Sequence, residues 1–214
     1  MPPVRRDERS ANAAPPSALK VMEQDDMTTG TSRRKVHTRR IECRAFRRDD
    51  GLFEIEADLS DEKGQQVDFR TRPPVAPGQF MHRMGLTLVI DDEYTILEAR
   101  ASTQTAPWPS CGGTDADYAK LVGLRIGPGF SQRMKELLGG VRGCTHLTEL
   151  VAQAANTYMQ ASWPDRIARQ MAVSQDPLQW PDRSTLGFVD HCHAWRADGP
   201  TLAQEYPELA GGKE

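Results

Sequence analysis

A glycine-rich stretch in the second half of the chain, residues 139–150, places a thiol and an imidazole two positions apart, at Cys144 and His146. Apolar residues then recur at steps of three and four, which predicts an amphipathic helix to about Met159 with Thr145 as its N-cap. The positive end of that helix favours an ionised thiol. Cys144 is therefore either a reactive or metal-binding thiol or a small buried filler, and His146 is either a site residue or a surface capping residue.

A second candidate for metal binding is the tract His191, Cys192 and His193. The surrounding segment, residues 186–196, has the apolar and polar pattern of a short strand. In a strand the two histidines would share one face and the cysteine would lie on the other, so at most two of the three could reach one ion. A role in a strand or at a sheet edge is therefore favoured over metal ligation.

Composition and charge narrow the class of protein. The 214 residues contain 38% hydrophobic residues and carry a net charge of -3, which fits one globular domain with flexible ends. Residues 1–40 hold nine Lys/Arg against five Asp/Glu, which is typical of a solvated tail and not of a nucleic-acid-binding arm. No apolar run is long enough to span a bilayer, and no secretory signal is apparent. We expect a cytoplasmic protein that binds neither nucleic acid nor membrane.

The number and spacing of the four cysteines fit a reducing cytoplasm. They are too few and too dispersed for a disulfide scaffold, so a clustered subset would indicate metal or redox chemistry. They are Cys43, Cys111, Cys144 and Cys192. Cys43 falls on the apolar face of a predicted strand and is expected in the core.

The elements that must position these side chains begin with four predicted strands. Apolar and polar residues alternate over residues 36–46, 53–59, 84–90 and 95–101, and turn residues separate the members of each pair. The strands form two hairpins, which we expect to join in one antiparallel sheet. Residues 61–77 are polar and contain prolines, so they are predicted to be a connection.

The second half of the chain reads as loops and helices. A loop over residues 103–113 exposes Cys111, and short helices are predicted at 115–122, at 132–138 with Ser131 as the cap, and at 166–173, after a break at Trp163 and Pro164. The chain is divided into a disordered tail (residues 1–34), a single α+β domain (35–207) and a flexible C-terminus (208–214).

Four motifs together resemble a bacterial domain-of-unknown-function family, number 2889. They are residues 47–51, the hairpin 86–99, and residues 121–130 and 143–150. The resemblance covers about residues 36–207. It implies no activity.

Residues 84–100 are also similar to the central hairpin of the NifU-like iron–sulfur cluster assembly scaffolds. Those proteins have a cysteine in the loop after the hairpin and another at the start of a late helix, positions that Cys111 and Cys144 hold here. They carry an aspartate before the hairpin, near the position of His82. The resemblance implies a NifU-like α+β fold, an antiparallel sheet of three to five strands with two or three helices on one face. It also implies a zinc or iron site formed by His82, Cys111, Cys144 and His146. The alternative is that His146 only supports a ligand, which leaves three ligands and a coordination position open to water or substrate.

Two classes of function follow. The first is a metal-dependent enzyme of lyase or hydrolase type acting on a small organic molecule, with Cys144 and His146 catalytic and Arg125, Arg142 or Glu149 assisting with an anion or a proton. The second is a non-catalytic metal or iron–sulfur handling protein that acts through a protein partner. An open coordination position favours the enzyme, and a closed four-ligand site favours the carrier.

Overall fold

The computed structural model describes residues 31–180 and 186–210. The chain divides into two units, Met1–Arg34 and Lys35–Glu214. The predicted disordered tail lies outside the described residues except for residues 31–34, and residues 211–214 of the predicted flexible C-terminus also lie outside them.

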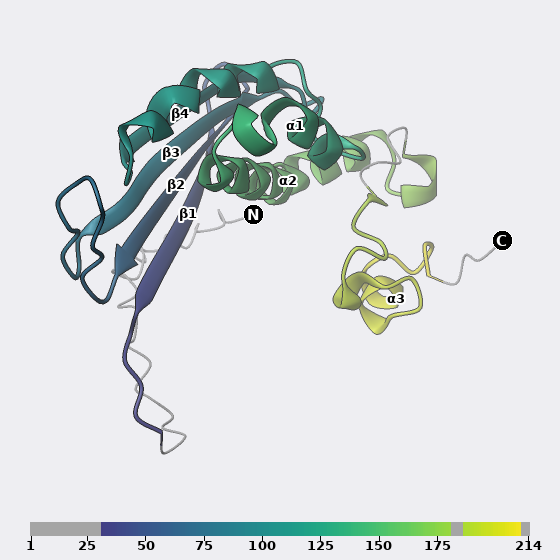
Figure 1. Cartoon of the computed structure of the whole chain (residues 1–214). Coiled ribbons are helices and arrows are strands. Elements are labelled where there is room, and N and C mark those ends of the chain that lie inside the picture. Colours follow the sequence, from purple (N-terminus) through teal and green to yellow (C-terminus); the bar gives the residue numbers. More distant parts are fainter. Residues whose placement is uncertain (1–30, 181–185, 211–214) are drawn as a thin grey trace, which may run out of the picture. The chain divides into compact units, whose positions relative to one another are not determined.

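The second unit is built on a four-stranded antiparallel sheet in the order β1-β2-β3-β4 (Figure 1). The strands are β1 (His37–Arg47), β2 (Phe53–Lys63), β3 (Phe80–Ile90) and β4 (Ile96–Thr105). All four predicted strands are confirmed. The turn between the first two closes with a hydrogen bond from Gly51 N to Arg48 O, and Gly51 has a φ of 84°, a left-handed conformation that glycine adopts without strain.

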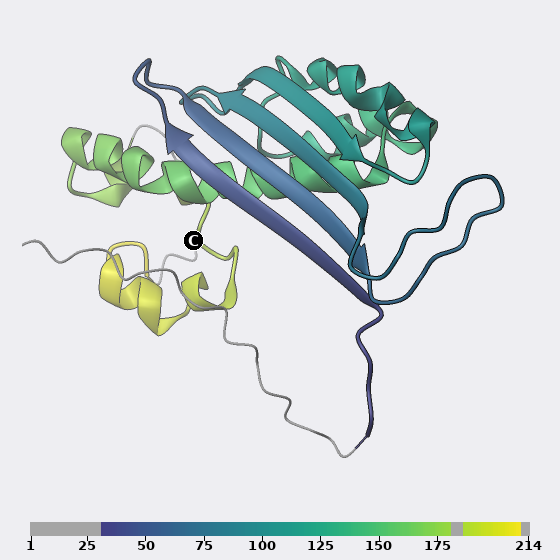
Figure 2. The same cartoon turned by 90° about the vertical axis from the view of Figure 1, so that its left-hand side faces the viewer.

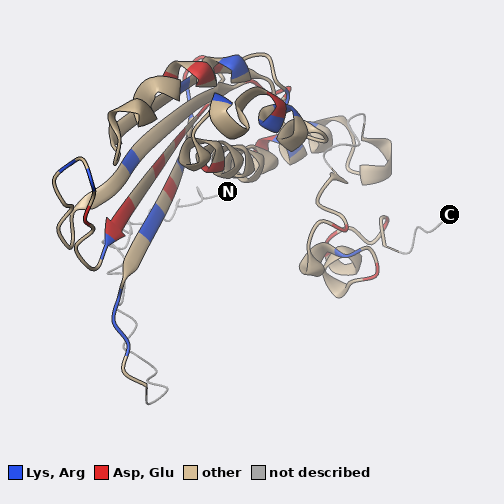
Figure 3. Ribbon diagram, in the orientation of Figure 1, with Lys and Arg blue, Asp and Glu red and all other residues tan. Residues whose placement is uncertain are grey.

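Strand β2 is longer than predicted, because charged residues continue the alternation. Residues 61–63 were expected in a connection, but Asp61 and Glu62 pair across the ladder with Arg39 and Arg40 of β1. Opposite charges on neighbouring strands stabilise a ladder in which apolar residues are absent. Figure 3 shows acidic positions on β2 beside basic positions on β1.

Helices cover one face of this sheet, as Figures 1 and 2 show. The α+β class with helices packed on one face is therefore confirmed. The predicted loop 103–113 differs from the structure at both ends: residues 103–105 belong to β4, and residues 109–113 join the predicted short helix in one 3-10 helix, η1, against β4. Within the described residues, the helical elements include η1 (Pro109–Leu121), α1 (Phe130–Leu138), η2 (Gly140–Arg142), α2 (Thr145–Val173), η3 (Pro177–Gln179), η5 (His193–Trp195) and α3 (Pro200–Glu205).

The long helix α2 differs from the prediction at both ends. It continues through Pro164 to Val173, although a proline inside a helix removes one backbone hydrogen bond. Buried residues beyond the proline, Arg166 and Ile167, keep that part of the helix packed on the protein. The N-cap is Cys144 and not Thr145, because Cys144 has an extended backbone and its carbonyl accepts the first helical hydrogen bond, from Thr148 N at 2.9 Å.

Packing fixes the start of α2 against the sheet. Leu147 and Leu150 on α2 and Leu88 on β3 are completely buried in one core. The Tyr118 hydroxyl of η1 accepts a hydrogen bond from Cys144 N at 3.2 Å and lies 2.9 Å from Cys144 O. The first turn of α2 is thus held both by the core and by η1.

The tract His191–His193 is not a strand, so this prediction is wrong. His191 lies in a turn, Cys192 is the N-cap of η5 and His193 is the first residue of η5; all three residues are exposed. Asp190, immediately before it, has a φ of 59°, which an extended strand does not allow. Over the described part of the chain, no helix combines the length and the apolar character needed to cross a membrane.

Candidate metal centre

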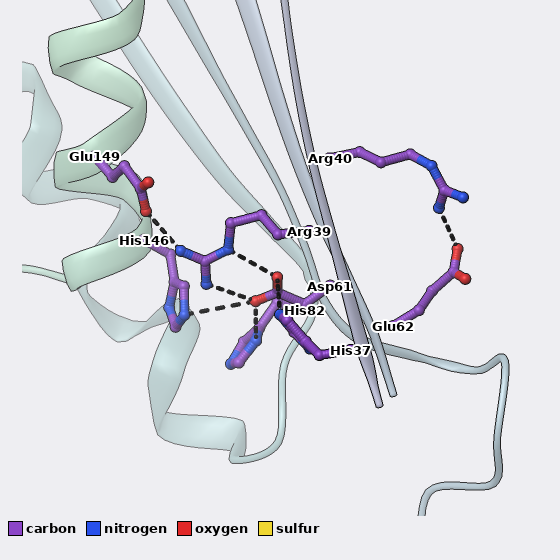
Figure 4. Close-up of polar contacts among 8 residues, drawn as sticks. All are labelled: His37, Arg39, Arg40, Asp61, Glu62, His82, His146 and Glu149. Carbon is purple, nitrogen blue, oxygen red and sulfur yellow. Dashed lines mark hydrogen bonds and ion pairs between the residues drawn. The ribbon is translucent and has the colours of Figure 1, made fainter. Parts of the chain in front are cut away.

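The carboxylate of Asp61 lies near the end of β2 on the helix-covered face and is the centre of a group of nitrogen atoms (Figure 4). Its side chain is only 3% exposed. Arg39 Nε donates to Asp61 Oδ1 and a terminal Arg39 nitrogen donates to Oδ2, both at 2.8 Å. His37 Nε2 lies 3.2 Å from Oδ1. Asp61 is therefore anchored by a two-pronged arginine contact, the strongest common geometry for a carboxylate.

Two more imidazoles converge on the other oxygen of Asp61. His82 Nδ1 lies 3.0 Å from Oδ2, and His146 Nε2 lies 3.7 Å from it. The two rings are neighbours, with centroids 4.0 Å apart. One potential ligand atom from each of the three residues lies within 4.8 Å of the other two. One carboxylate and two imidazoles form a donor set that suits zinc, iron(II) or manganese.

Three separate elements bring these side chains together. Asp61 follows Leu59 in the inward-facing positions of β2, and it pairs in register with His82 of β3. His82 in turn precedes the buried Met84 by two positions, so it shares the inward face. His146 lies in the first turn of α2. The group therefore forms where the inward faces of two strands meet the start of a helix.

Electrostatics keep the three side chains in the state that binds a metal. Burial alone would raise the pKa of Asp61, but hydrogen bonds and positive charge from Arg39, with His82 and His37, lower it to about 2. Burial is the largest cause of a lowered pKa at His82; Asp61 raises this pKa, and the positive charges of Arg39 and Lys63 lower it further. Burial, followed by the nearby charges of His82 and Arg39, lowers the pKa of His146. The low pKa of Asp61 keeps its carboxylate ionised at neutral pH, and the lowered pKa values of both histidines favour the neutral imidazole, the form that binds a metal.

These shifts predict that the metal-free protein loses stability as the pH falls. The folded pKa values of His82 and His146 lie below their ordinary value of 6.5, so folding favours the neutral rings, and stability declines as the pH drops below about 6.5. The substitution His82→Gln should make that decline shallower, and His191→Gln, at an exposed turn, should not. Urea unfolding at several pH values between 7.5 and 5 measures the slope; equal slopes in the wild type and His82→Gln would contradict the prediction.

Cys144 lies beside this group on the far side of the His146 ring. Its Sγ is 3.7 Å from His146 Nδ1 and 4.0 Å from Met84 Sδ. Since His146 turns Nε2 towards Asp61, the thiol contacts the nitrogen that points away from the carboxylate. Glu149 is connected to the group through Arg39, whose second terminal nitrogen donates to Glu149 Oε2 at 2.7 Å.

The other predicted site residues make different contacts. Arg142 donates to Lys135 O on α1, and Arg125 donates to Glu93 O and lies over the Tyr94 ring. Cys111 lies in η1, where its backbone N–H bonds to Trp108 O. Neither cysteine of the predicted ligand set belongs to the group of three ligand atoms found among the described residues.

Sequence reasoning missed Asp61, Arg39 and His37. The signal was present, because Asp61 continues the period-two series of Ile55, Ala57 and Leu59, and the two β1 residues precede Ile41 in the same alternation. Asp61 was not identified as a site residue because the polar residues from Asp61 onwards were predicted to be a connection and not part of a strand.

Comparison with known proteins places the chain in a family. No curated protein and no solved structure matches it. One family does match, over residues 37–160, which include all four strands, η1, α1 and most of α2. The NifU-like resemblance stays a prediction. The chain therefore belongs to the family described as "Protein of unknown function (DUF2889)".

Proposed function

We propose that this protein binds a divalent transition metal, zinc or iron, through Asp61, His82 and His146. We further propose that it uses the metal in a lyase- or hydrolase-type reaction on a small organic molecule. The observation that carries the proposal is the convergence of one buried carboxylate and two imidazoles from β2, β3 and α2. Buried acids and histidines that gather in this way are typical of metal ligands.

The number of ligands favours an enzyme over a carrier. A set of three protein ligands leaves coordination positions for water or substrate, whereas structural sites are closed by four. The side chains of His82 and His146 are 15% and 22% exposed, so solvent reaches the edge of the group. An ion held by Asp61, His82 and His146 would supply Lewis acidity to a substrate oxygen. The carrier that works through a protein partner is the alternative.

The residues around the ligands have supporting roles in this proposal. Arg39 holds both oxygens of Asp61 and is itself held by Glu149, so the two fix the orientation of the carboxylate. Such outer contacts commonly change metal affinity 10- to 100-fold. Cys144 contacts Nδ1 of His146 and helps to turn Nε2 towards Asp61.

A second candidate function is nucleophilic catalysis by Cys144 without a metal. The observation that favours it is the order of contacts, in which His146 lies between the Cys144 thiol and the Asp61 carboxylate, 3.7 Å from each. A thiol, an imidazole and a carboxylate in series form the arrangement used by cysteine nucleophiles. Fast alkylation by iodoacetamide at neutral pH that chelators do not change would favour this candidate.

The metal content of the purified protein distinguishes the proposed metal centre from metal-free catalysis by Cys144. After purification without chelators, elemental analysis should find close to one equivalent of zinc or iron. The variants Cys111→Ser and Cys144→Ser should keep that metal, because Asp61 and the two histidines provide the ligands. Loss of the metal in either variant would restore that cysteine as a ligand, as the NifU-like resemblance implies. Less than about a tenth of an equivalent in the wild type would contradict the proposed metal centre.

A further inference from the structure

The sheet face that the helices leave uncovered contains a hollow of about 250 Å³ across β2, β3 and β4 (Figures 1 and 2). Gly85 of β3 lies in the middle of it, with Asp58 of β2 on one side and Ser102 and Gln104 of β4 on the other. Because glycine has no side chain, the central strand leaves this space open. The hollow faces solvent, so a small molecule can enter it without any movement of the fold.

Three polar atoms converge on the point where a side chain at Gly85 would begin. A Cβ added there would lie 3.2 Å from Ser102 Oγ, 3.4 Å from Gln104 Nε2 and 3.5 Å from Asp58 Oδ1. These distances are slightly longer than hydrogen bonds, and the ends of the three side chains are free to close on a ligand. One ligand atom above Gly85 can therefore contact all three.

Existing hydrogen bonds determine what each of these atoms can still offer. Arg44 donates to Asp58 Oδ2 at 2.7 Å, which leaves Oδ1 turned towards the hollow as an acceptor. Gln104 Nε2 donates one hydrogen to Ser102 Oγ at 3.2 Å and has a second hydrogen to give. The Ser102 hydroxyl keeps its own hydrogen.

This combination selects one kind of ligand group. Asp58 Oδ1 only accepts, Gln104 Nε2 only donates, and Ser102 Oγ does either. An ammonium group cannot accept from Gln104, and an ionised oxyanion cannot donate to Asp58. A hydroxyl group donates one hydrogen bond and accepts two, so it satisfies all three atoms at once.

The charges around the hollow also disfavour an anion, because both of its arginines already contact carboxylates. The pairs are Arg44 with Glu42, Glu56 and Asp58, at 3.5, 3.0 and 2.7 Å, and Arg100 with Glu98, at 2.6 Å. Four carboxylates against two arginines leave no excess of positive charge to attract an anion. A neutral ligand needs no further counter-charge here.

The size of the hollow distinguishes such a ligand from a single water molecule. A water molecule can make the same three hydrogen bonds, but the hollow is several times larger than its share of liquid volume, roughly 30 Å³. We propose that the hollow binds a small hydroxyl-rich molecule, a monosaccharide or a cyclic polyol. One hydroxyl lies above Gly85, and the others face Glu56, Thr87 and Arg100, which also line the hollow.

This site is separate from the metal centre. Asp58 and Asp61 are an odd number of residues apart on β2, so their side chains lie on opposite faces of the sheet. The metal centre is on the helix-covered face and the hollow is on the open face. Binding here does not depend on the proposed metal chemistry, and each can fail without the other.

The test is an NMR titration of the nitrogen-labelled full-length protein. The probes myo-inositol, D-ribose and D-glucose are added in separate arms, and putrescine and sodium acetate serve as a cation and an anion at constant ionic strength. We expect at least one hydroxyl compound to shift the Gly85 backbone signal and the Gln104 side-chain amide signal along one saturation curve in the millimolar range. Putrescine and acetate should not saturate these signals.

Variants test whether the hollow itself is the site. Gly85→Ala puts a methyl group where the ligand hydroxyl lies, so the Gln104 signal should no longer respond. The fold should tolerate it, because Gly85 is not in the left-handed region and the atoms it would meet are the ends of side chains. Gln104→Met removes the amide donor and should weaken binding roughly tenfold, read from the Gly85 signal. Gly113→Ala, where a Cβ has no neighbour within 4 Å, should bind as the wild type does.

Three results would overturn the proposal. The first is that none of the three hydroxyl compounds gives a saturable shift. The second is that putrescine or acetate saturates the same signals while the hydroxyl compounds do not. The third is that Gly85→Ala, with a melting temperature equal to that of the wild type, binds the hydroxyl compound with unchanged affinity.

Discussion

Replacing Asp61 with asparagine should lower metal affinity by more than about 100-fold, since changes to residues that only support ligands already cost 10- to 100-fold. Asparagine keeps the shape of the side chain but removes the negative charge that the metal and Arg39 share. The metal-free protein should also lose about 2 kcal/mol of unfolding free energy at pH 7, because the pKa of the buried Asp61 is lowered to about 2 from 3.8. Isothermal titration with zinc and urea unfolding measure the two effects.

The pH dependence gives a further signature of the same residue. The folded pKa of Asp61 is below the unfolded value, so its contribution is fully present above about pH 4 and is lost as the pH falls through about 2. The stability difference between the wild type and Asp61→Asn should therefore narrow in strong acid.

A matched control lies three positions earlier on the same strand. Asp58 is on the opposite face of β2, is 50% exposed and pairs with Arg44. Asp58→Asn should change stability by no more than about 0.5 kcal/mol and leave metal affinity intact. If Asp61→Asn binds zinc as tightly as Asp58→Asn does, Asp61 is not a ligand.

The sheet could be predicted from the sequence because its core strands alternate strictly. Phe53, Ile55, Ala57 and Leu59 are all buried, as period-two reading requires. The ends of strands were less predictable. Residues 61–63 are held in β2 by ion pairs to β1, and such pairs depend on a register that local patterns do not contain.

Helix α2 illustrates a second reason why the ends of an element are hard to predict from the sequence. Local propensity places a boundary at Pro164, yet burial of Arg166 and Ile167 keeps the chain helical beyond it. Tertiary packing offsets the cost of one lost hydrogen bond. A local sequence pattern does not contain this packing. The same holds for η1, which packs against β4 and in which the end of a predicted loop continues into a predicted short helix as one 3-10 helix.

Two of the three clustered side chains, His82 and His146, are candidates from the sequence: His146 because it lies beside Cys144, and His82 because of the NifU-like resemblance. The structure brings their rings to 4.0 Å. Their common partner Asp61 could be found only by extending β2 and aligning it with β3, since 21 residues separate Asp61 from His82. Cys144 and His146 are close in sequence, but the sequence does not show which nitrogen of the His146 ring faces the thiol. The ring turns Nε2 towards Asp61, so Nδ1 faces Cys144.

The position of His146 depends on the tight connection before α2, and Gly143 is the residue that makes this connection possible. A Cβ added at Gly143 would overlap the carbonyl oxygen of Leu138 and would lie 3.2 Å from both the Leu138 carbonyl carbon and its Cβ. Leu138 is 1% exposed at the end of α1, so its backbone cannot move aside easily. The backbone of Gly143 is extended, with a φ of -156°, so the required feature is space and not an unusual conformation.

We therefore expect Gly143→Ala to destabilise the protein by about 1–3 kcal/mol, the usual range for an overpacked core. Relief of the overlap must shift the start of α2, which contains Cys144 and His146, relative to the strands that hold Asp61 and His82. Metal affinity should fall along with stability, although no ligand has been changed. Urea unfolding and zinc titration of the same variant measure both.

Gly113→Ala is the control, because a Cβ at Gly113 has no neighbour within 4 Å and its φ is not in the left-handed region. That variant should match the wild type in stability and zinc affinity. If Gly143→Ala is destabilised but binds zinc with unchanged affinity, the first turn of α2 does not set the geometry of the ligands, and His146 would have to be removed from the proposed metal centre.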